Sequence, residues 1–314
     1  MPGDFCVTVN GVADITVSHE LIILAALKQD VLIERYDRVL ACGPVSERLR
    51  EIASINAPRL KERLEISEDD ASEGLAYHLE IALARILFHT QRYKHGGALL
   101  LAGLGGTSHL NVKHGITYDR LTKAVVDMAY QAAQEGMISH FIYGHLLPAN
   151  KSVPPEAFRE YARTDFAMRD SMSEMAGCVR FIASLSRVDG LVLMDRSLGV
   201  SGFGVEIVGV PEVETIHVPS DESGEVAREI AANDFGTRHR SMFRYCNAHA
   251  DSVGFVVSQD GLIRAIMRVG DRLLMWENIQ VLSSVHEGDD VEERICPHCQ
   301  PDTESQLCET ESAE

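Results

Sequence analysis

Side chains suited to binding phosphate are concentrated in one run of seven residues in this acidic chain: Phe235-Gly236-Thr237-Arg238-His239-Arg240-Ser241. Arg238 and Arg240 each carry a planar fork of donors that matches two phosphate oxygens. Gly236 allows close approach of the backbone or a positive φ, and Thr237 and Ser241 add hydroxyl groups. Helix-compatible residues follow, so N–H groups at a helix start would complete an anion site. A solvated basic turn paired with carboxylates has the same composition, and these residues alone leave both interpretations open.

The elements around this run alternate between strands and helices. Glycine-led apolar segments predict strands at 191–195 and 201–208, and the segment 253–266 predicts two strands joined by a Gln-Asp-Gly turn. A helix is expected from Ser241, after an acidic insertion at 211–233. This alternation predicts an α/β fold with a mixed β-sheet flanked by helices.

The first half of the chain predicts an N-terminal α/β region. Ser67 is expected to cap a helix that buries a leucine stripe, and a glycine-bounded apolar run, 97–103, predicts a buried strand. Further helices are expected at the ranges 45–64 (with a break at Ala57-Pro58), 117–134 and 156–168, and a helix end is expected at 179–185. Prolines make 148–157 the expected linker. The predicted division is therefore 1–150, 151–285 and an acidic, disordered tail at 286–314.

The composition of the chain indicates which classes of binding partner are disfavoured. The chain has 314 residues and a net charge of −18, which repels nucleic acid polymers and anionic membranes over long range. Its apolar runs are too short to span a bilayer, and its first residues do not resemble a secretory signal. Seven scattered cysteines favour a reducing compartment. We therefore expect a cytoplasmic protein with a small-molecule partner.

The order of motifs over about 176–282 resembles the diadenylate cyclase (DAC) domain family. An Asp-Gly strand start at Asp189-Gly190-Leu191, the run Gly236-Thr237-Arg238-His239-Arg240 and a serine at a strand end, Ser258, carry the resemblance. The family joins two ATP molecules into cyclic di-AMP, with each protomer of a face-to-face pair presenting one nucleotide. The resemblance thus implies a DAC-like nucleotide-binding domain at 151–285, a homo-oligomer and an adenine nucleotide as ligand.

The resemblance also implies roles for individual residues. Asp189 would hold a catalytic Mg²⁺ or Mn²⁺, and His239 would assist at the metal or the triphosphate. Phosphate or nucleotide contacts would come from the remaining motif residues, namely Gly190, Leu191, Gly236, Thr237, Arg238, Arg240, Ser241 and Ser258. A carboxylate-bound cation neutralises charge on an attacked phosphate, and arginines stabilise the transition state, so the chemistry is coherent.

The sequence departs from the family pattern at two of the motifs. Leu191 replaces a small alanine, and Gln259-Asp260 replaces the acidic residues that usually follow the serine. The arrangement is closest to DAC-like sensor proteins of the DACNV type, which bind nucleotides without making them. The sequence therefore leaves two hypotheses, a diadenylate cyclase and a non-catalytic sensor of a nucleotide or cyclic dinucleotide.

A separate signal lies in the acidic tail. Cys296, Cys299 and Cys308 include a single Cys-x-x-Cys pair. One such pair is half of a typical structural zinc site, and neighbouring carboxylates raise thiol pKa values, which weakens redox reactivity. The alternatives are a metal half-site completed by another chain and a disordered segment.

Overall fold

The computed structural model describes residues 5–11, 14–19, 22–28, 31–33, 38–103, 107–259, 261–279 and 281. The expected acidic tail, its three cysteines and Asp260 lie outside these residues. No helix in the described ranges is both long and apolar enough to cross a membrane.

Two sheets make up the β-structure. The N-terminal segment forms a four-stranded antiparallel sheet in chain order, with strands β1 (Phe5–Gly11), β2 (Asp14–His19), β3 (Ile22–Lys28) and β4 (Val31–Ile33). The second sheet has nine strands in the order β10-β9-β13-β12-β11-β5-β7-β8-β6. Its strands are β5 (Gly97–Leu101), β6 (Leu110–Tyr118), β7 (Leu191–Met194), β8 (Val200–Ile207), β9 (Thr215–Pro219), β10 (Ala227–Ala231), β11 (Val253–Val257), β12 (Ile263–Val269) and β13 (Arg272–Trp276).

The nine-stranded sheet is mixed, as the sequence predicts. Strand β5 pairs in parallel with β7 and antiparallel with β11, and β13 pairs in parallel with β9. Every residue of β5, β7 and β11 is buried. Both faces of these central strands must therefore be covered, which explains their continuous apolar sequences.

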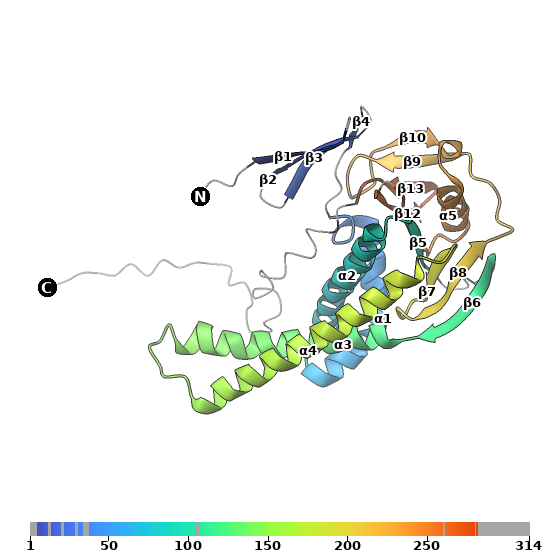
Figure 1. Cartoon of the computed structure of the whole chain (residues 1–314). Helices are drawn as coiled ribbons and strands as arrows, with labels where there is room; N and C mark the ends of the chain where they lie inside the picture. Colours follow the sequence, from blue (N-terminus) through green and yellow to red (C-terminus); the bar gives the residue numbers. More distant parts are fainter. Residues whose placement is uncertain are drawn as a thin grey trace.

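Helices cover the two faces unequally. One face packs against α1 (Gly43–Leu64), α2 (Glu68–Arg92), α3 (Arg120–Ser139) and α4 (Pro155–Leu185), and the other packs against the single helix α5 (Thr237–Ala248) (Figure 1). Alternate residues of β11 divide between two cores. Phe255 joins the core of the four-helix side, whereas Val256 joins the core under α5.

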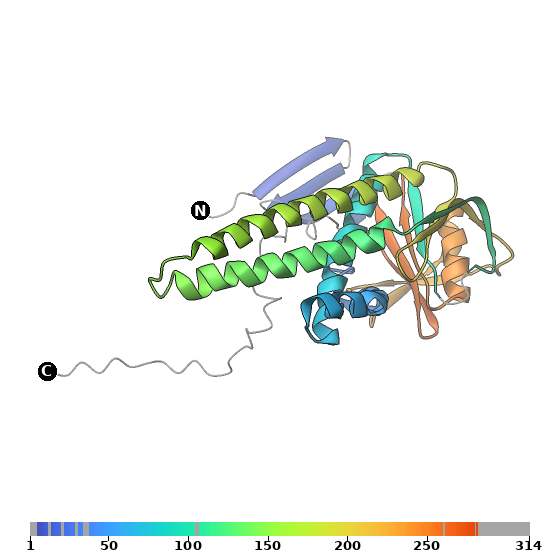
Figure 2. The same ribbon diagram turned by 90° about the horizontal axis from the view of Figure 1, so that it is seen from below.

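Helices α3 and α4 form a long hairpin that extends well beyond the sheet (Figure 2). A short π-helix, η1 (His140–Leu146), and a turn connect them. The domain boundary predicted at residue 150 falls at the end of this hairpin. Strand β5, from the N-terminal side of that boundary, lies at the centre of the sheet, so the boundary does not separate two sheets.

The N-cap prediction at Ser67 is confirmed, since its Oγ accepts a hydrogen bond of 3.1 Å from the backbone N–H of Asp70. The break predicted at Pro58 is wrong. Helix α1 continues through it because Ala57 and Leu60 are buried on the face that packs into the core, and this burial offsets the lost backbone hydrogen bond.

Three other predicted segments differ from the structure. The helix predicted at 156–168 and the helix end predicted at 179–185 belong to one continuous helix, α4. The helix predicted from Thr117 begins at Arg120, because the end of β6 pairs with β8. The acidic insertion 211–233 contains the outer strands β9 and β10, whose burial alternates along β9 as in a strand with one covered face.

Candidate functional site

The basic run forms the first turn of α5 rather than a loop before it. Gly236 is the N-cap, with φ −66° and ψ 167°, and the helix begins at Thr237. The glycine therefore does not supply a positive φ. A Cβ added there would meet no atom within 4 Å, so the position faces open space.

This helix start leaves backbone donors for a ligand. Gly236 has no side chain, and the helix has no side-chain cap. The first N–H groups of an α-helix have no intrahelical acceptor, and the partial positive charge of the helix dipole lies there. The N–H groups of Thr237 and Arg238 are thus positioned for an anion.

An open cavity of about 550 Å³ lies at this helix start. Its walls come from the η2–α5 connection, the end of β11 and the start of β12. The lining residues are Asp234, Phe235, Gly236, Thr237, Arg238, His239, Val256, Ser258, Gln259 and Arg264. Five of the predicted site residues therefore line one cavity, namely Gly236, Thr237, Arg238, His239 and Ser258.

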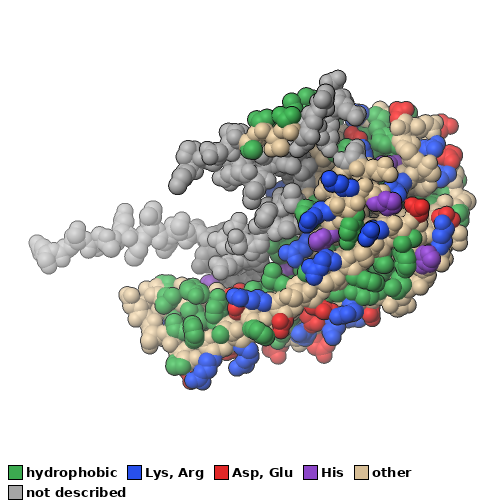
Figure 3. All heavy atoms as spheres, in the orientation of Figure 1, with side chains coloured by type: hydrophobic (Ala, Val, Ile, Leu, Met, Phe, Trp, Pro, Cys, Tyr) green, Lys and Arg blue, Asp and Glu red, His purple; other side chains and the backbone are tan. Residues whose placement is uncertain are grey.

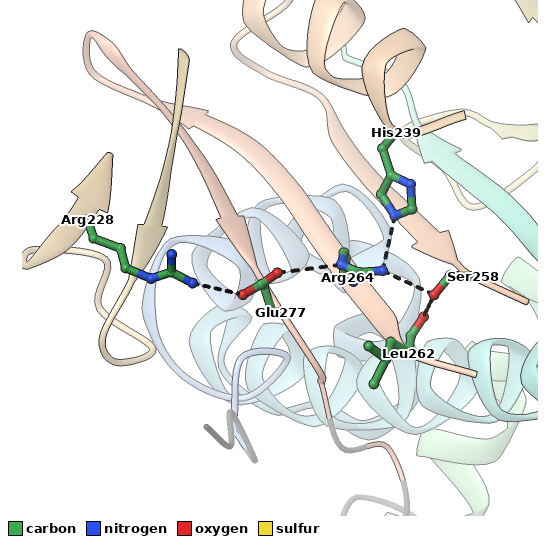
Figure 4. Close-up of polar contacts among 6 residues, drawn as sticks. All are labelled: Arg228, His239, Ser258, Leu262, Arg264 and Glu277. Atoms are coloured by element: carbon green, nitrogen blue, oxygen red, sulfur yellow. Dashed lines mark hydrogen bonds and ion pairs between the residues drawn. The ribbon is translucent and has the colours of Figure 1, made fainter. Parts of the chain in front are cut away.

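Arg264 is the central cation of the cavity, and the sequence analysis missed it. Its Nη1 donates to Ser258 Oγ at 3.0 Å and to His239 Nε2 at 3.2 Å (Figure 4). Its Nε lies 3.8 Å from Glu277 Oε1, and Glu277 also pairs with Arg228 at 3.3 Å. Only 12% of the Arg264 side chain is exposed. A polar position between Ile263 and Ala265 in a buried strand was the available sequence signal, because an arginine is rarely buried without a partner.

The hydrogen bond from Arg264 determines which ring nitrogen of His239 acts as an acceptor. An arginine only donates hydrogen bonds, so Nε2 of His239 accepts and carries no proton. His239 is 8% exposed and its ring lies near those of Phe235 and Phe243. In this arrangement His239 holds Arg264 in place.

Ser258 also positions Arg264. Its hydroxyl accepts from Arg264 and donates to the backbone carbonyl of Leu262 at 3.0 Å (Figure 4). The hydroxyl thus ties the β11–β12 turn to the guanidinium.

Arg238 lies across the edge of the sheet from Arg264. A Cβ added to Gly96, which has φ +71°, would lie 2.6 Å from Arg238 Nη1 and 3.1 Å from the carbonyl oxygen of Val257. The guanidinium therefore rests against the glycine turn that enters β5. A glycine at position 96 provides both the backbone conformation and the space for Arg238.

The other two residues of the basic run lie elsewhere on α5. Ser241 accepts a hydrogen bond of 3.0 Å from Arg244, which also pairs with Glu212. Arg240 and Ser241 are partly buried, and neither lines the cavity. Each residue of an α-helix is rotated by about 100° from the last, so the four residues from 238 to 241 cannot all face one ligand.

The Asp189-Gly190-Leu191 motif lies at the same edge of the sheet, one strand beyond β5. Gly97 at the start of β5 pairs with Val257, and β7 runs parallel to β5 on its other side. Adjacent strands are about 4.8 Å apart, so Asp189 lies roughly 10 Å from the strand end at Ser258. The Asp189 side chain is exposed.

The other residues of this motif are packed in the fold. Gly190 has φ +116°, and a Cβ there would lie 2.5 Å from the backbone carbon of Gly204 in β8. Leu191 is 5% exposed in the core under α5 and does not line the cavity. Gly190 thus allows two strands to approach closely, and the bulk of Leu191 is directed into the core.

Metal-ligating side chains do not gather in the described part of the chain, where no group of three His, Cys, Asp or Glu residues is placed to hold an ion. Asp189 stands apart from the cavity wall. The described site is therefore an arginine-rich cavity suited to an anion, with one carboxylate, Asp234, in its wall and another, Asp189, outside it. Comparisons with protein-family models, with characterised proteins and with solved structures find no match to this chain.

Proposed function

We propose that this protein binds an adenine nucleotide through its phosphate groups at the N-terminus of α5. The observation that supports the proposal is that the uncapped first turn of α5 opens on a cavity of about 550 Å³, in which Arg264 is fixed by hydrogen bonds and Arg238 rests against Gly96. Backbone N–H groups and guanidinium forks are the two donor types that bind phosphate best.

The size of the cavity supports a ligand larger than a phosphate ion. Cavities of 300–1,000 Å³ typically hold small organic ligands. The choice of adenine as the base rests on the resemblance to the DAC family. The proposal that the protein forms a homo-oligomer rests on the same resemblance. A chain of net charge −18 needs such a local cluster of cations to hold a polyphosphate.

A divalent cation fits this site only in part. Mg²⁺ is commonly held by one or two carboxylates together with substrate phosphates and water. The motif offers Asp189 and the cavity wall offers Asp234, so the cation would need the nucleotide oxygens as further ligands. Bound in that way, Mg²⁺ or Mn²⁺ would neutralise charge on the phosphate under attack.

The alternative is a sensor that binds the nucleotide without turnover. Two observations favour this alternative. The Asp189 side chain is exposed, and Asp189 precedes β7, which lies two strands away from β11 and Ser258. In this alternative the arginines and the helix N-terminus act alone, and binding needs no metal.

Incubation with ATP and Mn²⁺ followed by mass spectrometry separates the two functions. The cyclase predicts cyclic di-AMP, and loss of that product in Asp189→Asn with the fold retained. The sensor predicts no product but a ligand-dependent rise in melting temperature.

Arg238→Ala tests the proposal that both functions share. It should remove the rise in melting temperature, because Arg238 lines the cavity. Arg163→Ala is a matched control on the exposed side of α4, and it should leave the rise unchanged. If neither ATP nor cyclic di-AMP shifts the melting temperature of the wild-type chain, the nucleotide proposal is wrong.

A further inference from the structure

A second group of cations lies on the opposite side of the sheet from α5. Arg85 and Arg92 on α2 lie seven residues apart and so share one helix face, while Arg180 lies near the end of α4 and Arg187 lies just beyond it. We call these four arginines and Lys94 the basic patch. Lys and Arg side chains gather over this part of the molecule in Figure 3.

The cations of the patch lie close together. His89 sits among them, and its pKa is lowered by burial and then by Arg180, Arg92 and Arg85. Two of the arginines are held over aromatic rings: Arg92 lies 5.7 Å from the ring centre of Phe88, and Arg187 lies 5.5 Å from that of Tyr93.

The patch lacks counter-charges in the described part of the chain. Within those residues, no carboxylate lies within 4.0 Å of any of the five cations, whereas Arg120, Arg169 and Arg244 each have such a partner. A cluster of unneutralised cations in a chain of net charge −18 is a strong local attractor for carboxylates.

The chain itself holds a segment of opposite charge. Residues 282–314 contain ten Asp and Glu residues and one Arg. The described chain ends at Val281, and Ile279 and Val281 are buried in the core that α2 and α4 share. The segment therefore begins on the four-helix side of the sheet, which is the side that carries the patch.

The acidic segment 282–314 is also long enough to reach the basic patch. An extended chain spans about 3.3 Å per residue, so 33 residues reach roughly 100 Å, more than the length of α2. Attachment to the same chain also raises the effective concentration of the segment at the patch.

We propose that the acidic C-terminal segment, residues 282–314, docks on the basic patch at the C-terminal ends of α2 and α4 of its own chain. The patch ends at Lys94, two residues before Gly96, whose turn lies against the guanidinium of Arg238. The docked segment would therefore lie beside the edge of the sheet that carries the candidate site.

Cross-linking of the full chain tests the proposal without any substitution. A reagent with one maleimide and one succinimidyl ester joins a cysteine to a lysine. The segment holds Cys296, Cys299 and Cys308, and Lys94 is the lysine of the patch, while Lys113 and Lys151 lie elsewhere. At low salt, links from the segment to Lys94 should exceed those to the two other lysines several-fold. They should fall to the level of those lysines in about 1 M salt, where the Debye length is ~3 Å.

Charge reversal identifies the surface. The double variant Arg92→Glu and Arg180→Glu changes two exposed side chains and should remove the preference for Lys94, whereas Arg163→Glu on the exposed side of α4 should keep it. Equal linking to all three lysines in the wild type would refute docking. Links to Lys94 found only between two chains would refute docking within one chain, and so would links that survive the double reversal.

Discussion

The two ends of the candidate site are built in different ways. At the α5 end, Arg264 is fixed by Ser258, His239 and Glu277, and Arg238 rests in the space left by Gly96. At the β7 end, Gly190 is fixed by the fold while the carboxylate beside it, Asp189, is exposed. Preorganised donors bind a ligand without the cost of ordering them. Under the proposed function, the α5 end would bind phosphate with side chains already in position, whereas Asp189 would be ordered only when a nucleotide and a cation bind.

The largest expected effect is on the fold at the β7 end. Gly190→Ala places a Cβ 2.5 Å from the backbone of Gly204 at φ +116°, so both strain and overlap oppose it. We expect a loss of about 3 kcal/mol or more in the free energy of unfolding. Thermal denaturation should show a melting temperature lower by roughly 6–12 °C.

Gly115→Ala is the matched control in β6, because no atom lies within 4 Å of its added Cβ. Its melting temperature should stay close to the wild-type value. If Gly190→Ala were equally harmless, the close approach of β7 and β8 would not constrain the Asp-Gly motif.

The second largest expected effect is a loss of nucleotide affinity when Arg264, at the α5 end, is replaced. Arg264→Met keeps the length of the side chain and removes the donors to Ser258 and His239. Hydrogen bonds to charged groups contribute about 1.5–3 kcal/mol, so nucleotide affinity measured by calorimetry should fall about 10- to 100-fold.

Arg268→Met separates this effect from a general loss of charge in β12. Arg268 lies on the same face of the strand but donates to the backbone oxygens of Asn247 and Gly270, away from the cavity. Its affinity should match the wild type. Equal losses in both variants would mean that Arg264 does not act at the site.

Much of the fold around the site follows from sequence patterns. The buried strands β5, β7 and β11 were predictable because each is a short apolar run bounded by glycine or a turn. Strand β10 was not, since an edge strand carries polar residues that resemble a loop, and the short strand β9 beside it lies in the same acidic stretch of sequence. The single helix α4 was also missed, because its middle lacks the apolar repeat of a helix packed on a sheet.

The part of the site that is formed by consecutive residues was predictable from the sequence. Gly236, Thr237 and Arg238 are adjacent in the chain and remain adjacent at the cavity. Arg264 is contributed by a separate strand, and only the pairing of β11 with β12 brings it to Ser258. The helix rotation that turns Arg240 away also depends on where α5 starts, and the sequence placed that start at Ser241 instead of Thr237.

A smaller effect is expected from adding a side-chain cap at the N-terminus of α5. In Gly236→Ser the new Oγ can accept from the first-turn N–H groups, as serine does at other N-caps, and this should stabilise the protein by a few tenths of a kcal/mol. The same bond competes with phosphate, so nucleotide affinity should fall about 3- to 10-fold. The free protein should melt slightly higher while the shift caused by nucleotide becomes smaller. A rise in both quantities would show that the helix start does not bind the ligand.

The smallest expected effect decides whether the β7 end belongs to the site. Asp189→Asn keeps the shape of an exposed side chain and removes its charge, so the melting temperature should change little. Without metal, nucleotide affinity should be unchanged, because the α5 end makes the phosphate contacts. With Mn²⁺, any gain in affinity that the wild type shows should be lost, because the cation would lose a carboxylate ligand that it shares with the nucleotide. A gain that persists in Asp189→Asn would place the metal elsewhere. No gain in the wild type would leave the α5 end as the whole site and favour a sensor over a cyclase.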